Sequence, residues 1–278
     1  MGYFGPNGWI LGALVLVMAA SDGIAADATD QFEAFKAGSA KTIDHSAWAG
    51  LLNTYVVPGP DGLNRVRYAA FKAEGQPALK AYIKRLEGST VTDLDRPEQF
   101  AFWANLYNAK TIDLVLDHYP VKSIKDVSLG GSITSLFTVG PWKAQVTKVQ
   151  GQALSLDDIE HGILRGIFED PRVHYAVNCA SNGCPNLATR ALTGATLEAA
   201  LDAGATAYIN HPRGVRVEKG EVIASSIYDW FKSDFGGTAE GALAHWRKYA
   251  NPALKQQLEG MSKISRFDYD WSLNDAKQ

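Results

Sequence analysis

The stretch Ser155–Pro185, SLDDIEHGILRGIFEDPRVHYAVNCASNGCP, decides the fold class because its residue pattern changes three times. Its first four residues are typical of a helix N-terminus, and apolar residues then recur at helical spacing to about Phe168. The β-branched and aromatic run VHYAVNCA predicts a short strand that ends near Cys179. After a four-residue loop, Cys184 is predicted to be the N-cap of a helix that begins at Pro185.

The flanking regions add further helices and hairpins. Helical patterns occupy about 27–61, 68–86, 226–235 and 239–258, and a Gly- and Ser-rich stretch at 129–140 predicts a long loop. WKAQVTKVQGQALSL and VRVEKGEVIAS alternate around glycine-containing turns, which predicts two hairpins. No repeating strand–helix order is present, so we expect an α+β fold, a mostly helical single domain with short antiparallel strands.

The central helix is predicted after Asp95, where Asp-Arg-Pro-Glu resembles a capping box with proline in the first turn. The sequence that follows is apolar nearly all round and stops before Pro120, a pattern typical of a buried helix. Asn105 and Asn108 are three residues apart and therefore share one face of this helix.

The N-terminus predicts export. Residues 9–20, WILGALVLVMAA, form an apolar run too short to span a bilayer comfortably, and small residues follow it. We therefore expect a signal peptide at 1–26, a mature domain at 27–278 without an integral membrane span, and a periplasmic or secreted location. The first basic residue is Lys36, so the usual basic start is missing and an uncleaved anchor stays as the alternative.

The composition indicates a globular protein, and a net charge of −3 gives no electrostatic reason to expect nucleic acid as a partner. We expect a small molecule or a peptide instead. Ligand types that zinc prefers occur near the cysteines, but their spacing matches no paired ligand pattern. No metal and no cofactor are therefore predicted.

A helical wheel at about 100° per residue places Glu160 in the middle of an apolar face, with His161 and Arg165 together on another side. A carboxylate on a core-facing stripe needs a partner or a proton. Glu160 is therefore expected to be buried beside the cysteine loop, as a structural ion pair or as a group with a shifted pKa that lines a cleft.

Cys179 and Cys184 allow two interpretations. In an oxidising compartment so close a pair predicts a disulfide, which requires Cα atoms within about 7 Å. Alternatively, the positive end of the helix predicted at Pro185 would activate the Cys184 thiol, with His161, His174 or His211 as its base.

Five strings place the chain near a known family. FWANLYNA, LSLDDIEHGILR, DPRVHYAVNCASNGCP, IYDWFKSDFG and YDWSLN resemble, in order, the family called domain of unknown function 547, from about residue 94 to 278. The resemblance implies an α+β domain common in exported bacterial proteins, and it implies no reaction. The family pattern centres on the Glu160–His161 pair, Arg165 and the two cysteines. At fold level the family is similar, by analogy, to papain-like or transglutaminase-like thiol enzymes.

The leading hypothesis is a thiol-dependent hydrolase or acyl transferase. Its nucleophile would be Cys184 or Cys179, with His161 as general base and Glu160 supporting it. Substrate or oxyanion contacts are assigned to Asn105, Asn108, Asn178 and Arg165. The alternatives are a binding module, with a structural disulfide beneath a pocket near Tyr269 and Trp271, and a thiol–disulfide redox protein.

Overall fold

The computed structural model describes residues 29–129 and 140–276. The predicted signal peptide and almost all of the loop predicted at 129–140 lie outside these ranges. Within them the chain is mixed α+β, as predicted: helices dominate and the strands form three small sheets. No helix in the described part of the chain is long and apolar enough to cross a bilayer.

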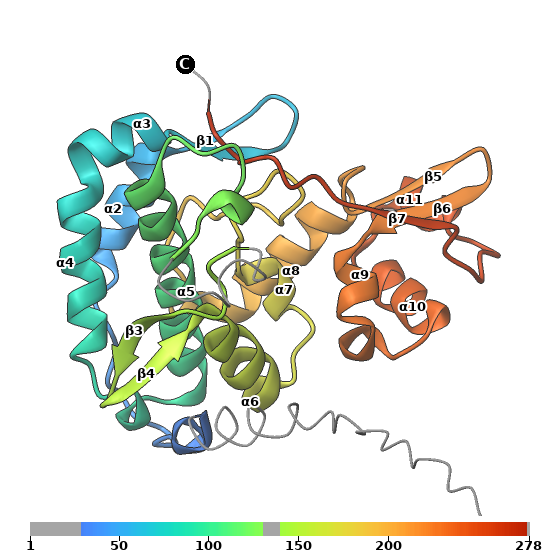
Figure 1. The fold of residues 1–278 in the computed structure, drawn as a ribbon. Coiled ribbons are helices and arrows are strands. Elements are labelled where there is room, and N and C mark those ends of the chain that lie inside the picture. The colour runs from blue at the N-terminus through green and yellow to red at the C-terminus, as the bar shows by residue number, and fades with distance from the viewer. Residues whose placement is uncertain (1–28, 130–139, 277–278) are drawn as a thin grey trace, which may run out of the picture.

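The elements fall into two groups, each with its own hydrophobic cluster. The first group contains α2 (Ser46–Tyr55), β1 (Val56–Pro58), β2 (Asn64–Val66), α3 (Tyr68–Ala70), α4 (Gln76–Glu87), α5 (Arg96–His118), β3 (Gln145–Val149), β4 (Gln152–Ser155), a π-helical segment (Asp158–Arg165) and α6 (Gly166–Phe168). The later elements are α7 (Val173–Ala176), α8 (Leu197–Ile209), β5 (Val215–Glu218), β6 (Glu221–Ser225), α9 (Ile227–Trp230), α10 (Ala239–Tyr249), α11 (Pro252–Gln257) and β7 (Arg266–Asp268). Figure 1 shows α8 running between the two groups.

Helix α5 is the central helix that the sequence predicted. The Asp95 carboxylate accepts a hydrogen bond from the Arg96 N–H, and Pro97 lies in the first turn. Every residue from Glu98 to Leu116 is buried. Helix α4 and the π-helical segment pack against α5, and α2 in turn packs against α4 (Figure 1).

Both predicted hairpins are confirmed as the antiparallel pairs β3–β4 and β5–β6. Strand β7 adds a parallel pairing to β6 that the sequence did not indicate. Beyond β7 the C-terminal tail returns across the molecule to the first group, where Val66 bridges Asp275 (Figure 1). The tail therefore joins the two groups a second time.

The strand predicted at VHYAVNCA is wrong, because Val173–Ala176 forms the short helix α7. The Asp170 carboxylate accepts a hydrogen bond from the Arg172 N–H, with Pro171 between them, so the chain enters α7 through a capped turn. Val173, His174 and Tyr175 are consecutive and all buried, so a strand-like alternation of residue types could not show which side chains face the core.

The helix predicted to begin at Pro185 is also wrong, and the next α-helix starts at Leu197. Side chains of the first group bind the intervening backbone instead. Asn64 donates to the Leu187 carbonyl over 2.8 Å. Cys184 is therefore no N-cap, and the predicted activation of its thiol by a helix that begins at Pro185 is wrong.

Candidate functional site

A cavity of about 170 Å³ lies where the two hydrophobic clusters meet. Short helix α7 marks this boundary, because Val173 and Val177 belong to the first cluster and Tyr175 to the second. The cavity is lined by Tyr107, Trp142, Asp157, Glu160, His161, His174, Val177, Cys179, Cys184, Pro185, Ile227, Trp230, Phe231, Tyr269 and Trp271. The structure thus brings the Glu-His pair and both cysteines to one place, as the sequence predicted.

One side of the cavity, the disulfide wall, is built on the bonded pair Cys179–Cys184. Their Cα atoms lie 6.3 Å apart, which confirms the predicted proximity. Cys184 is buried, whereas Cys179 is partly exposed. The Cys179 N–H donates to Cys184 Sγ over 2.9 Å. The Tyr269 hydroxyl donates to the same sulfur over 3.1 Å and lies 3.1 Å from Cys179 Sγ.

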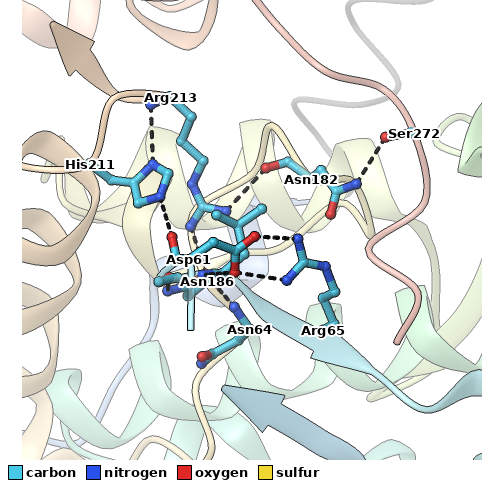
Figure 2. Close-up of polar contacts among 10 residues, drawn as sticks. Asp61, Asn64, Arg65, Asn182, Asn186, His211, Arg213 and Ser272 are labelled. Carbon is cyan, nitrogen blue, oxygen red and sulfur yellow. Dashed lines mark hydrogen bonds and ion pairs between the residues drawn. The ribbon is translucent and has the colours of Figure 1, made fainter. Parts of the chain in front are cut away.

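The loop that carries the disulfide is held by other segments (Figure 2). Arg213 donates to the Asn182 carbonyl over 3.1 Å and to Asn186 Oδ1 over 2.6 Å. The Asn182 amide donates to Ser272 Oγ over 2.9 Å, and Asn186 donates to the Gly62 carbonyl over 2.9 Å. Both flanks of Cys184 are therefore fixed by hydrogen bonds that do not involve sulfur.

His211, one of the predicted bases, belongs to this holding network and does not line the cavity. Its Nδ1 accepts a hydrogen bond from the Arg213 N–H over 3.2 Å, and its Nε2 lies 2.9 Å from the Asp61 carbonyl (Figure 2). Because Nδ1 accepts, Nε2 carries the proton and donates to Asp61. His211 therefore ties the α8–β5 connection to the β1–β2 hairpin.

The three asparagines predicted to bind substrate hold backbone instead, and none lines this cavity. Asn178 donates to the Pro185 carbonyl over 2.7 Å and accepts from the Ala180 N–H over 2.9 Å. Asn108 accepts from the Asn178 N–H over 2.8 Å. Asn105 likewise exchanges two hydrogen bonds with the backbone of residue 192. These buried amides position the loop.

Another part of the lining, the acidic wall of Asp157 and Glu160, comes from the start of the π-helical segment. Ser155 and Asp158 cap it reciprocally, as predicted: the Ser155 N–H donates to Asp158 Oδ2, and the Asp158 N–H donates to Ser155 Oγ. Glu160 is 9% exposed, which confirms its predicted burial. Tyr107 donates to Glu160 Oε2 over 2.7 Å. Burial raises the pKa of Glu160, although the Tyr107 bond opposes this.

Asp157 is the less satisfied carboxylate of this wall. Its nearest basic side chain among the described residues is His161, with 3.7 Å between Asp157 Oδ1 and Nε2. The distance is too long for a hydrogen bond. Burial raises the pKa of Asp157.

His161 is held by Arg165, which donates from Nη1 to His161 Nδ1 over 3.2 Å. A guanidinium only donates, so Nδ1 accepts and the imidazole proton sits on Nε2. Burial lowers the pKa of His161, which favours the neutral ring. Within the described part of the chain, His161 makes no hydrogen bond to either sulfur, so it does not serve a thiol in this geometry.

Arg165 is engaged by Asp234, a residue that the sequence analysis did not single out. Two hydrogen bonds of 2.6 and 2.8 Å join them, and His174 Nε2 lies 2.8 Å from Asp234 Oδ2. Burial alone would raise the pKa of Asp234, but the bonds from Arg165 and His174 lower it strongly. Asp234 thereby positions Arg165 and His174 directly, and it positions His161 indirectly, because Arg165 binds His161.

Aromatic rings complete the cavity. Trp230, Tyr269 and Trp271 contact one another with centroids 4.8–5.6 Å apart, and Trp142 meets Trp271 at 5.7 Å. Trp230 is 47% exposed, so the group reaches the surface. Tyr269 and Trp271 were predicted beside a pocket, whereas Trp142 and Trp230 were missed because no spacing relates these distant segments.

Metal binding has no support in the described ranges, where no three His, Cys, Asp or Glu side chains are grouped as a metal site. The cavity offers instead a disulfide with hydrogen-bond donors, two desolvated carboxyl groups and exposed aromatic faces. This combination suits thiol chemistry or ligand binding.

Residues 91–209 match the family model described as Protein of unknown function, DUF547. The match begins close to residue 94, where the family resemblance was predicted to begin. It ends before the segments IYDWFKSDFG and YDWSLN. No curated protein and no solved structure gave a significant match. The part of the chain from α5 to α8, including the acidic wall and both cysteines, belongs to the DUF547 family.

Proposed function

We propose that the protein exchanges its Cys179–Cys184 disulfide with thiols that enter the cavity. The observation that carries this proposal is the unequal setting of the two sulfurs. Cys179 is partly exposed, whereas buried Cys184 Sγ accepts hydrogen bonds from the Cys179 N–H and the Tyr269 hydroxyl. These donors favour a negative charge on Cys184.

The exchange follows from this arrangement. A substrate thiolate attacks Cys179 Sγ, forms a mixed disulfide and expels Cys184 as a thiolate that the two donors stabilise. A second thiolate of the substrate then attacks its own sulfur in the mixed disulfide and releases Cys179. The substrate dithiol loses two electrons and becomes a disulfide, and the protein gains them as a dithiol.

The hydrogen bonds around the loop support a reactive rather than a purely structural pair. Asn178, Asn186 and Arg213 hold both flanks of the loop through groups other than sulfur. The two cysteines therefore stay adjacent after reduction, which favours rapid return to the disulfide. A purely structural cross-link would add little to a loop so held.

Redox titration of the purified protein in thiol–disulfide buffers tests the proposal. We expect reversible reduction with retained fold, and we expect Tyr269→Phe to slow exchange because the leaving thiolate loses a donor. Tyr107→Phe is the matched control, since it removes a hydroxyl from the same cavity that contacts Glu160 and neither sulfur. A disulfide that resists reduction until the protein unfolds, or equal rates in both variants, would leave the binding-module interpretation in its place.

The thiol-hydrolase hypothesis keeps one supporting observation, because Cys179, His161 and Glu160 line the same cavity. It requires a free thiol and a His161 released from Arg165. In the reduced protein, His161→Ala would then abolish alkylation of the reactive thiol without unfolding the chain. Unchanged alkylation kinetics would remove this second candidate.

Export is proposed from the sequence of the first 26 residues alone. It would place the disulfide in an oxidising compartment, where such bonds persist. Intact-mass measurement of material from the exported fraction checks this, with a mature start expected between Ser21 and Thr29. A retained Met1 in the membrane fraction would instead indicate an anchor.

A further inference from the structure

The cavity has a marked charge imbalance. Among the described residues that line it are two carboxyl groups, Asp157 and Glu160, and no lysine or arginine. Of its two histidines, His174 is bound to Asp234, and His161 accepts a hydrogen bond from Arg165 and is neutral. The cations that act on these carboxyl groups, Lys143 on Asp157 and Arg165 on Glu160, lie outside the lining, so no lysine or arginine side chain occupies the cavity wall itself.

Asp157 is the group most in need of a partner. Its side chain is 27% exposed, and within the described ranges it makes no hydrogen bond: His161 lies 3.7 Å away, and Lys143 acts on it only through its charge. Glu160, by contrast, already accepts the Tyr107 hydroxyl. A partly desolvated carboxylate without a hydrogen bond is costly, and an ammonium or guanidinium group entering the cavity would relieve that cost.

The aromatic rings favour the same kind of ligand. Faces of tryptophan and tyrosine attract cations, and the attraction grows when water is excluded. Trp271 already makes such a contact, since Lys125 Nζ lies 4.1 Å from its ring centroid. The rings of Trp142, Trp230 and Tyr269 lie in the same group.

Size limits what can enter. The cavity of about 170 Å³ is smaller than the roughly 300–1,000 Å³ typical of pockets for drug-sized ligands. It suits a group of side-chain size, so the charge and the reacting sulfur of a ligand would lie only a few bonds apart.

We infer that the site prefers thiols that carry a positive charge close to sulfur, such as an aminothiol or a peptide cysteine next to a basic group. The inference rests on the proposed thiol exchange and adds the class of substrate. The cation would lie between the Asp157 carboxylate and the aromatic rings while the thiolate attacks Cys179 Sγ.

Three small thiols of similar size test this preference: cysteamine, 2-mercaptoethanol and 3-mercaptopropionate. The rate of disulfide reduction by each is divided by its rate with hydroxyethyl disulfide, which removes the difference in intrinsic reactivity. We expect the normalised rate for cysteamine to exceed that for 3-mercaptopropionate by about tenfold or more at low salt, and the ratio to fall as salt is added.

Asp157→Asn should remove most of the preference, and so should Trp230→Ala, whose ring is exposed enough for the fold to tolerate its loss. Glu221→Gln is the control, since it removes one exposed carboxylate from the β5–β6 hairpin. Equal normalised rates, or a preference that survives Asp157→Asn, would overturn the inference and leave the exchange reaction standing. No exchange with any of the thiols would overturn the proposed function itself.

Discussion

The two sides of the cavity treat their polar groups in opposite ways. Around the disulfide wall, Asn178 bonds the backbone of its own loop, and Cys184 Sγ accepts from the Cys179 N–H and from the Tyr269 hydroxyl of a distant segment. On the acidic wall, the described residues give Glu160 one hydrogen-bond donor and give Asp157 none, with His161 at 3.7 Å. One wall stabilises the fold, whereas the other keeps charge that the fold does not neutralise.

This difference indicates where ligand affinity would come from. A polar group that already has its partners, such as the Asn178 amide, gains little from a new contact. An unsaturated wall gains most from a ligand that supplies the missing charge. Stability measurements should therefore separate the two walls, with loss on one side and little loss or a gain on the other.

The largest effect is expected for Asn178→Ala on the disulfide wall. The substitution leaves the Pro185 carbonyl and the Ala180 N–H buried without their partner. We expect the free energy of unfolding to fall by about 2–4 kcal/mol, measured by denaturant titration. Asn182→Ala, in the same loop, removes one exposed side-chain bond and should cost less than about 1 kcal/mol. Similar costs for both substitutions would mean that the buried hydrogen bonds of Asn178 stabilise the fold no more than the exposed bond of Asn182.

On the acidic wall, Glu160→Ala should cost about 1–3 kcal/mol, because it leaves the Tyr107 hydroxyl buried without an acceptor. Glu160→Gln keeps an acceptor there and removes the desolvated charge. Its stability at pH 7 should therefore equal or exceed that of the natural protein. If Glu160→Gln is as unstable as the alanine variant, the charge itself stabilises the wall and the contrast fails.

Removing the cross-link should have a moderate effect. For a closed loop this short, the chain-entropy model gives about 2 kcal/mol. We expect the Cys179→Ser, Cys184→Ser double variant to lose no more than that and to keep slow amide hydrogen exchange at Ala180, whose N–H binds Asn178. Loss of protection there would show that the disulfide, rather than the hydrogen bonds, holds the loop.

The smallest effect is a difference in pH dependence. Burial raises the pKa of folded Glu160 above its ordinary 4.5. As pH rises from 4.5 to the folded pKa, the unfolded state loses its proton first, so the free energy of unfolding falls across that window. His161 acts oppositely, since its lowered pKa makes stability fall as pH drops below 6.5.

Subtracting the stability of Glu160→Gln from that of the natural protein at each pH cancels the His161 contribution. The difference should decline from pH 4.5 upward and then level off. A difference that rises with pH would reverse the assigned direction of the Glu160 shift.

Local sequence signals predicted the elements that depend on neighbouring residues. Capping at Asp95 and Ser155, the largely apolar sequence of α5 and the glycine turns of the two hairpins act within a few residues, and the structure has the caps, the buried helix and the hairpins. The burial of Glu160 and the proximity of Cys179 and Cys184 were predictable for the same reason.

The helical pattern predicted at about 27–61 is wrong over much of its length, because 34–45 is not helical and Val56–Pro58 forms β1. Two further local errors lie where competing signals were present. VHYAVNCA has the composition of a strand, but the Asp-Pro-Arg turn before it starts a helix, and burial on all sides hides any periodicity. After Pro185, side chains of Asn64 and Asn105 bind the backbone and replace the hydrogen bonds that a helix would supply.

By itself, the sequence determined the central helix, the hairpins, the capped start of the acidic wall and a cysteine pair within bonding distance. Only the tertiary structure decided what surrounds that pair. Tyr269 reaches the sulfurs because β7 pairs in parallel with β6, and Asp234 reaches Arg165 across the boundary between the two hydrophobic clusters. Hydrogen bonds and charge pairs of this kind depend on distance in space, which the order of residues along the chain does not encode locally.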